Sequence, residues 1–239
     1  MSKKRVYNIL AKANESIKSD NIFFESKEKC YSFLNPYGYN LMRQNIDLFE
    51  KIDVLFFDGI LLCHFYNLFY KGKVSRKSFD MTSIAKSLFT YLDDNNKTIY
   101  FIGAKQEEVE GAIKRFKEDF PNMNIMGFRN GYFKNDFERS EVINYIISLN
   151  PDFVVVGMGA IVQEKFIVDL KEFGFKGVSF TCGGFIHQAS ENLFFFPDWI
   201  NKLHLRSFYR LYKEKATRKR FSKTIFNFPI NFITDKFFK

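Results

Sequence analysis

The stretch PDFVVVGMGAIVQEKFI, residues 151–167, determines the fold that we predict for this chain. The run Phe153–Val156 within it is uninterrupted and β-branched, which is typical of a strand buried on both faces of a sheet. Gly157 and Gly159 follow at the end of this strand, and Gln163-Glu164 opens a helical segment. In α/β proteins this order of strand, glycines and helix binds phosphate groups, because glycines let the ligand reach backbone N–H groups. A tight turn without a ligand has the same spacing, so this stretch alone leaves both interpretations open.

Short apolar runs alternate with helical patterns along the rest of the chain. Further strands are predicted at 29–34, 52–57, 98–103, 124–126 and 177–180, and helices at 37–50, 60–70, 82–92, 106–120, 141–149 and 163–173. Alternating strands and helices with glycines at strand ends favour parallel neighbours. We therefore predict an α/β fold with a mostly parallel sheet and helices on both faces, followed by a helical, basic C-terminal appendage.

One carboxylate directly follows a predicted strand. Asp58 and Gly59 come after the apolar run 52–57. Side chains at the carboxyl ends of parallel strands line the ligand crevice of such folds, and a carboxylate there is suited to accept a proton. Taken by itself, however, an Asp-Gly pair is more typical of a turn.

Composition limits the classes of protein that need to be considered. The 239 residues suffice for one α/β domain with an appendage, and we place the boundary between 1–200 and 201–239. Cys30, Cys63 and Cys182 are scattered, without the spacing of a metal site or a disulfide framework, which favours a reducing cytoplasm. No apolar run reaches the roughly 18 residues that cross a bilayer, and no signal peptide is recognisable. No DxD motif or cluster of His and Asp suggests a bound metal.

Charge is concentrated at the C-terminus. The formal net charge is +9, and residues 202–239 hold 11 of the 36 Lys and Arg but 2 of the 27 Asp and Glu. The preceding part is therefore neutral. Basic residues interleaved with aromatic ones suit an anionic membrane surface or a nucleic acid. A solvated helix packed by its aromatic side chains is the third interpretation.

The stretch around Gly157 resembles the GxGxPxQE signature of the WecG/TagA/CpsF glycosyltransferases, glycosyltransferase family 26. Gly157, Gly159 and Gln163-Glu164 fit this signature, and Ile161 replaces its proline. Other family motifs occur in the same order. Their matching residues are Asn35 of TxN, Asp58 and Gly59 of ADG, Asp80 of GxD, Gly103 of the strand-end glycine pair, Gly131, Tyr132 and Phe133 of GxxxGYF, and Tyr209 and Arg210 of LEWLYRL. The resemblance covers roughly residues 31–220.

Several motif positions depart from the family. Phe33 replaces the threonine of TxN, and Arg206 replaces the glutamate of LEWLYRL. In the motif GxxFDxxAG, Ile186 stands in place of the aspartate and Ser190 in place of the last glycine. These departures leave open whether donor specificity, or activity itself, is altered.

The resemblance implies a fold of the GT-E type and an inverting, metal-independent glycosyltransferase without a cofactor. The donor would be a UDP-sugar, with N-acetylmannosamine or a related hexose as precedent, and the acceptor a sugar on a polyprenyl diphosphate. Asp58 would be the catalytic base. The substrate-binding residues implied are Asn35, Gly59, Asp80, Gly103, Gly131, Tyr132, Gly157, Gly159, Gln163, Glu164, Arg210 and Arg218. The enzyme would act in cell-surface polysaccharide synthesis, as a peripheral protein on the cytoplasmic face of the cell membrane.

Two alternatives remain at this stage. An α/β protein that binds nucleic acid would use the basic tail but would leave Asp58 and the GMGAIVQE stretch without a role, so we expect no nucleic-acid partner. A family member that binds sugar nucleotides without turnover would explain Phe33, Ile186 and Ser190. Self-association into a homo-oligomer is possible. The sequence does not identify the donor sugar or the acceptor glycan.

Overall fold

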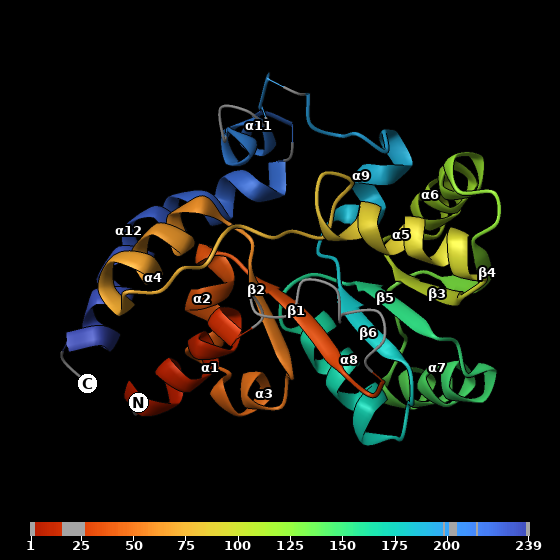
Figure 1. Ribbon diagram of the computed structural model, residues 1–239, viewed down its shortest axis with the longest axis horizontal. Helices are drawn as coiled ribbons and strands as arrows, with labels where there is room; N and C mark the ends of the chain where they lie inside the picture. Colours follow the sequence, from red (N-terminus) through yellow and green to blue (C-terminus); the bar gives the residue numbers. More distant parts are fainter. Residues whose placement is uncertain (1–2, 16–26, 198, 201–204, 214, 238–239) are drawn as a thin grey trace.

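The computed structural model is one α/β body (Figure 1) and describes residues 3–15, 27–197, 199–200, 205–213 and 215–237. The strands are β1 (Cys30–Leu34), β2 (Val54–Phe57), β3 (Thr98–Gly103), β4 (Asn124–Arg129), β5 (Phe153–Gly157) and β6 (Val178–Thr181). The helices are α1 (Lys3–Glu15), α2 (Pro36–Met42), α3 (Ile46–Glu50), α4 (Ile60–Tyr70), α5 (Ile84–Asn95), α6 (Gln106–Asp119), α7 (Asp136–Leu149), α8 (Val162–Glu172), α9 (Phe185–Glu191), α11 (Arg206–Lys213) and α12 (Lys215–Phe237).

The six strands form one sheet in the order β2-β1-β6-β5-β3-β4, and each neighbouring pair is parallel. The predicted α/β fold is confirmed. The predicted helix at 37–50 is wrong in one respect, because it is divided into α2 and α3. Asn45 has a non-helical backbone at this break, and its side-chain amide donates to the Leu41 carbonyl oxygen at 2.9 Å.

One helix begins earlier than predicted because of its N-cap, and another was not predicted. The helix predicted from residue 141 begins at Asp136, because the Asn135 side chain accepts a hydrogen bond from the Glu138 N–H at 2.9 Å. Such an N-cap satisfies one of the N–H groups that the first helical turn leaves without a partner. Helix α9 was not predicted, and it packs against α6.

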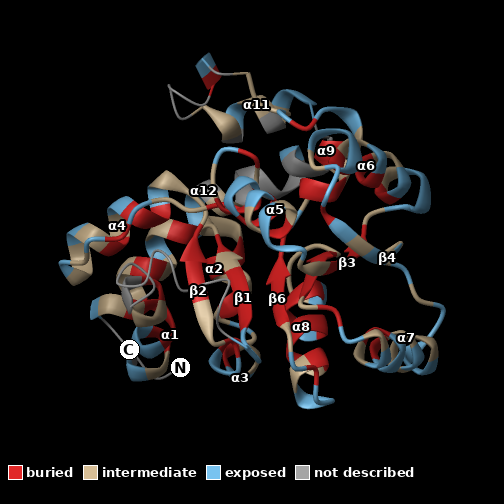
Figure 2. Cartoon of the chain, turned by 45° about the vertical axis from the view of Figure 1, so that its right-hand side comes forward, coloured by how far each residue is buried: buried red, intermediate tan, exposed pale blue. Residues whose placement is uncertain are grey.

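Apolar side chains cover both faces of the sheet (Figure 2). Along β3, Tyr100 and Ile102 point into the core formed with α1, α2, α3, α4, α7, α8 and α12. Ile99 and Phe101 point into the second core, formed with α5, α6 and α9. A parallel sheet covered by helices buries both sides of its strands, which explains the continuous apolar run at Phe153–Val156.

The last described helix, α12, is part of the main core. Phe228 and Phe232 are fully buried and pack on Phe65 of α4. Near the end of α12, Asp235 accepts a hydrogen bond from the Tyr39 hydroxyl at 2.8 Å and pairs with Arg43 at 2.6 Å. The boundary between residues 200 and 201 remains a prediction, but the part beyond it contributes to the same hydrophobic core.

None of the helices in the described ranges is both long enough and apolar enough to cross a membrane.

We predict that Phe232→Ala lowers the free energy of unfolding by about 3–5 kcal/mol, because it leaves a cavity in the core. Phe226 lies on the same helix but is 71% exposed, so Phe226→Ala is the matched control. We expect this control to change stability by less than about 0.5 kcal/mol. Urea denaturation of both variants provides the measurement, and equal losses would show that α12 does not contribute to the core as described.

Candidate active site at the carboxyl edge of the sheet

Asp58 lies at the carboxyl end of β2, on the edge where the predicted site residues gather. Its N–H donates to the Leu34 carbonyl oxygen at 2.8 Å, which fixes the backbone beside the end of β1. The side chain is one third exposed, and its Oδ1 lies 3.0 Å from Nη2 of Arg76. Asn35 is adjacent, because a Cβ placed on Gly59 would lie 3.7 Å from that of Asn35. The carboxylate is thus oriented by a cation and still accessible to a substrate.

Asp80 is the centre of a second cluster of charges. It accepts hydrogen bonds from the Ser78 hydroxyl at 2.5 Å and from the N–H and hydroxyl of Thr82. Arg206 of α11 forms an ion pair with the same carboxylate, and Arg76 lies 3.5 Å from it. Burial raises the pKa of Asp80, but Arg206 and the hydrogen bonds outweigh burial, so the pKa lies below its ordinary value. Asp80 therefore joins α11 to the loop that precedes α5.

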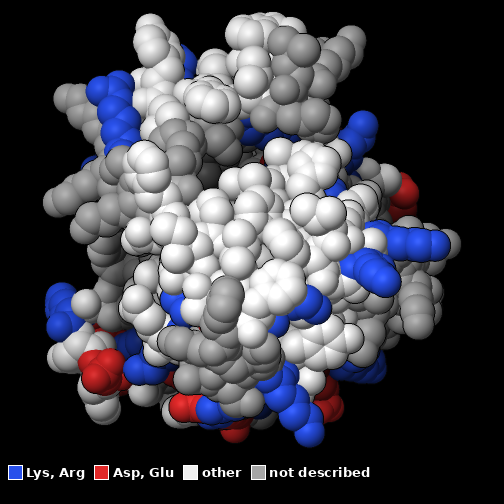
Figure 3. All heavy atoms as spheres, turned by 90° about the vertical axis from the view of Figure 1, so that its left-hand side faces the viewer, with Lys and Arg blue, Asp and Glu red and all other residues white. Residues whose placement is uncertain are grey.

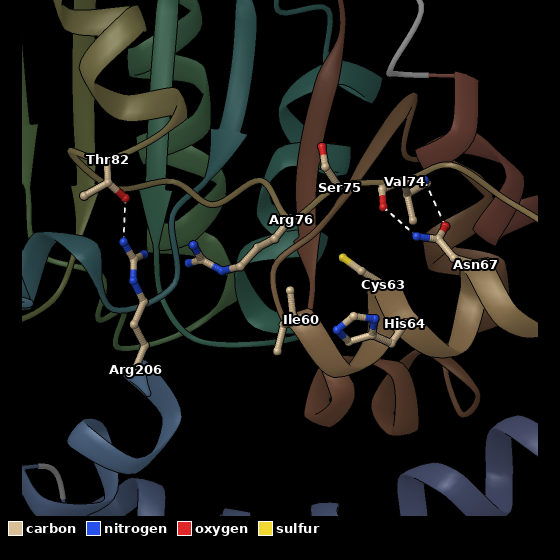
Figure 4. Close-up of a pocket in the computed structure, with 9 residues that line it drawn as sticks. All are labelled: Ile60, Cys63, His64, Asn67, Val74, Ser75, Arg76, Thr82 and Arg206. Atoms are coloured by element: carbon tan, nitrogen blue, oxygen red, sulfur yellow. Dashed lines mark hydrogen bonds between the residues drawn. The ribbon is translucent and has the colours of Figure 1, made fainter. Parts of the chain in front are cut away.

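A cavity of about 450 Å³ lies next to Arg76, the ion-pair partner of Asp58 (Figure 4). The residues that line it come from α4, from the loop that follows α4, and from α11: Ile60, Cys63, His64, Asn67, Val74, Ser75, Arg76, Thr82 and Arg206. Asn67 keeps the loop in place through two hydrogen bonds of 2.9 Å to the backbone of Val74. Burial, and then the charge of Asp58, raise the pKa of the Cys63 thiol to about 11, in keeping with a location close to that carboxylate.

The predicted glycines lie further along the same edge, at the ends of β3 and β5. A Cβ on Gly103 would lie 2.4 Å from the Gly157 carbonyl oxygen, so no larger residue fits there. Gly131 packs against this pair, since its Cβ would lie 3.0 Å from Cα of Gly103. Gly159 has a φ of 84° and open space where its Cβ would be. We call this group, Gly103, Gly131, Gly157 and Gly159, the glycine rim.

Gln163 and Glu164 lie behind the glycine rim, and both are buried. Glu164 accepts hydrogen bonds from the Ser32 hydroxyl, the Gln163 amide and the Ile161 N–H. Burial raises the pKa of Glu164, and these hydrogen bonds act against that shift. Gln163 in turn accepts from the Gly183 N–H at 3.1 Å. The two side chains connect β1, β6 and the start of α8, and their contact with a ligand remains a prediction.

Asp58 and the glycine rim are separated along the edge by β1 and β6. The three strand spacings between β2 and β5, about 4.8 Å each, place them roughly 14 Å apart. The helix after β5, α8, lies on one face of the sheet, and those after β6 and β3 lie on the other. Where successive connections leave to opposite faces, a crevice forms outside the carboxyl ends of the strands. The edge can therefore hold one elongated ligand.

The remaining predicted substrate-binding residues lie at separate places around this edge and on the C-terminal helices. Asn35 caps α2, with its Oδ1 accepting from the Gly38 N–H at 2.8 Å. Tyr132 is 65% exposed next to the glycine rim. Arg218 is exposed and donates to the carbonyl oxygens of Leu211 and Tyr212, at the end of α11. Arg210 belongs to α11, but its side chain lies outside the described residues.

Two arginines near Asp58 were missed by sequence reasoning. Arg76 precedes Asp80 by four residues, but both lie in a loop, so the helical spacing rule for opposite charges gave no signal here. Arg206 is 126 residues away from Asp80, so only the folded chain brings them together. Arg206 also lies over the ring of Phe196, at 4.8 Å from its centroid.

The chain matches one known protein family over almost its whole length. The sequence model described as "Glycosyl transferase WecG/TagA/CpsF family" matches residues 10–239. This range includes Asp58, the glycine rim and both helices of the C-terminal part.

Two individual relatives are also glycosyltransferases by name. The chain is 34% identical over 208 residues to a protein from Shigella boydii named "UDP-Gal:alpha-D-GlcNAc-diphosphoundecaprenol beta-1,4-galactosyltransferase", and the match covers 87% of each chain. It is also 34% identical over 128 residues to the "N-acetylglucosaminyldiphosphoundecaprenol N-acetyl-beta-D-mannosaminyltransferase" of Bacillus subtilis strain 168. That match covers 54% of this chain and 49% of the Bacillus protein.

We predict that Asp80→Asn lowers the free energy of unfolding at pH 7 by about 2 kcal/mol, because it breaks a largely buried ion pair with Arg206. Since the pKa of Asp80 is lowered in the folded protein, its carboxylate stabilises the fold above about pH 4. This contribution disappears as the pH falls through the folded pKa. The difference in Tm between wild type and Asp80→Asn should therefore be largest near pH 7 and should shrink as the pH falls below about 4. A difference that is unchanged by pH would contradict the charge network.

Proposed function

Because the chain belongs to the WecG/TagA/CpsF glycosyltransferase family, we propose that it transfers a hexose from a UDP-sugar to a sugar carried on a polyprenyl diphosphate. The observation that carries this proposal is the position of Asp58. An accessible carboxylate lies on the same sheet edge as the glycine rim, and its partner Arg76 lines a cavity. The product would serve the synthesis of a cell-surface polysaccharide.

The proposed donor lies across the sheet edge. Its diphosphate would bind at the glycine rim, where close backbone packing leaves room for phosphate oxygens near the start of α8. The sugar would then extend over β6 and β1 toward Asp58. Tyr132, exposed beside the rim, would contact the nucleoside. Asn35, Gly59, Asp80, Arg210 and Arg218 remain proposed substrate-binding residues, with the two arginines approaching the donor from the C-terminal helices.

In the proposed reaction, Asp58 removes the proton from an acceptor hydroxyl as its oxygen attacks C1 of the donor sugar. The new C–O bond forms on the face opposite to the bond that breaks, so the configuration at C1 is inverted. The electron pair of the breaking bond leaves with UDP. Backbone N–H groups and guanidinium groups would stabilise this growing negative charge, because fixed donors need no rearrangement during the reaction.

We propose that the transfer needs no metal and no cofactor. In the described ranges no three side chains of His, Cys, Asp or Glu are grouped as metal ligands. Arginine side chains would balance the charge of the diphosphates. Activity that persists in EDTA would support this proposal, and activity restored only by added divalent cation would refute it.

The relatives guide the choice of substrates to test. Both names specify N-acetylglucosaminyl diphosphoundecaprenol as the acceptor, and they differ in the sugar transferred. The galactosyltransferase aligns over a larger part of the chain, so UDP-galactose should be tested together with UDP-N-acetylmannosamine. We propose the same class of lipid-linked acceptor for this chain.

We also propose that the protein binds to an anionic membrane through α4 and α12, which lie side by side. Helix α4 has no charged residue, and Leu68 is 73% exposed. On α12, Phe226 and Ile230 are 71% and 64% exposed. Figure 3 shows this side of the molecule, with a broad uncharged area bordered by lysines and arginines, and by some carboxylates at the bottom and on the right. Apolar side chains rimmed by cations suit an anionic bilayer surface.

We predict that Asp58→Asn lowers kcat by about 10²–10⁴-fold, because the amide cannot accept the hydroxyl proton. Release of UDP in the presence of a lipid-linked acceptor provides the measurement. Asp119→Asn, at an exposed position on α6, is the matched control and should keep full activity. An unchanged Tm would show that Asp58→Asn is folded. Full activity of a folded Asp58→Asn would remove this residue from the mechanism.

For the membrane surface, we predict that the double variant Leu68→Glu/Phe226→Glu sediments with phosphatidylglycerol vesicles about ten-fold less than wild type, because two inserting side chains become charged. Phe173→Glu is the control, since Phe173 is 53% exposed at the end of α8, outside this surface. Sedimentation of the double variant at the wild-type level would disprove the docking surface. Loss of vesicle binding in the control as well would point to net charge alone.

A further inference from the structure

The cavity next to Arg76 has one wall made by a single face of α4. Ile60, Cys63, His64 and Asn67 follow each other at spacings of three, one and three residues, which places them on one side of the helix. His64 is exposed and points into the opening, with Arg76 and Arg206 across from it (Figure 4). The cavity is thus a defined space between α4, the loop after it and α11.

The α4 wall of this cavity and the glycine rim lie on opposite sides of Asp58, and Thr82 and Arg206 line the cavity across from that wall (Figure 4). The strand order places the rim toward β5 and β3, whereas α4 lies beyond the edge strand β2 (Figure 1). Direct contacts connect the cavity to Asp58, because Arg76 lines the cavity and also pairs with the carboxylate. A proton acceptor between two binding spaces suits a reaction that joins two substrates, one held on each side.

The charged residues of the cavity favour an anionic ligand. Among the described residues that line it, Arg76 and Arg206 are cationic and none is a carboxylate. A guanidinium has five N–H donors in a planar fork that matches phosphate oxygens, so two of them can bind a diphosphate while they keep their carboxylate partners. His64, Asn67 and Thr82 add polar groups that suit the hydroxyls and amide of a sugar.

The same helix also offers a path for a lipid. Leu61, Phe65 and Leu68 are four and three residues apart, on the side of α4 next to the cavity wall. Leu61 and Leu68 are 38% and 73% exposed. Phe65 packs on Phe228 of α12, so this apolar side continues into the proposed membrane surface. A ligand with an anionic head and a hydrocarbon chain would fit both sides of α4 at once.

We propose that this cavity holds the sugar-diphosphate head of the lipid-linked acceptor, with its polyprenyl chain lying along the apolar side of α4. This assignment rests on the proposed function and adds a location for the acceptor. The sugar hydroxyl would face Asp58 from the α4 side, while the donor sugar reaches Asp58 from the glycine rim. Arg76 and Arg206 bind the diphosphate of the acceptor, and His64 contacts its sugar.

The test fills the cavity without touching the glycine rim. The probe is N-acetylglucosaminyl diphosphate carrying a short alkyl chain, titrated calorimetrically into wild type and His64→Trp without a donor present. We expect the added volume to weaken binding of this probe by about ten-fold or more. Ile60→Trp fills the same space from the start of α4 and provides a second variant. Lys86→Trp, on the exposed surface of α5, adds the same side chain outside the cavity.

The same variants are then compared for binding of UDP-galactose and UDP by thermal shift. Unchanged nucleotide binding in His64→Trp and Ile60→Trp, together with weakened acceptor binding, is the expected result. Acceptor binding at the wild-type level in both folded variants overturns the assignment, and so does a wild type that does not bind the probe. Loss of nucleotide binding would assign the cavity to the donor instead. If wild type binds the probe and the variants do not, but no UDP-sugar is turned over, the proposed function fails while the anionic sugar site stands.

Discussion

The candidate site depends on the charge network that joins Asp58, Arg76, Asp80 and Arg206. These four residues come from the end of β2, the loop before α5 and the start of α11, so no single element positions them. Of the two carboxylates, Asp80 is the more buried. Arg206 and hydrogen bonds from Ser78 and Thr82 lower its pKa and so stabilise its ionised form. Because Arg76 lies between the two carboxylates, the position of Asp58 is coupled to the docking of α11 over the cavity.

The glycine rim imposes a different kind of constraint, which is steric. A Cβ on Gly103 would collide with the Gly157 backbone, and a Cβ on Gly157 would lie 2.9 Å from Sγ of Cys182 and 3.2 Å from Cδ1 of Ile186. This contact gives Ile186 a structural role in the chain, where the family motif has an aspartate. Ion pairs fix the positions of side chains near β2, whereas close backbone packing shapes the edge at β3 and β5. The two ends of the edge therefore differ in construction, in keeping with the separate roles proposed for them.

Much of the fold could be predicted because it depends on local patterns. The apolar run at Phe153–Val156 indicated a strand covered on both faces, and the parallel sheet confirms it. The break at Asn45 and the early start at Asn135 depend on single side-chain hydrogen bonds, which periodicity does not reveal. In the site, Asp58 and the glycines could be predicted, because they follow strand ends and match the spacing of known motifs. Arg206 was not, because its pairing with Asp80 joins distant parts of the chain. For the basic tail, packing by aromatic side chains was one of three interpretations, and the burial of Phe232 in the main core agrees with it.

The pairing of Arg206 with Asp80 also bears on how this enzyme has diverged. Where the family motif LEWLYRL has glutamate, this chain has an arginine, and its partner is a carboxylate on another segment. A chimaera that received its C-terminal helices from a relative with the glutamate would place two negative charges against each other. Like charges in a largely enclosed position repel strongly. The C-terminal part is therefore not an interchangeable module, and swapping it between homologues requires its partner loop to be exchanged as well.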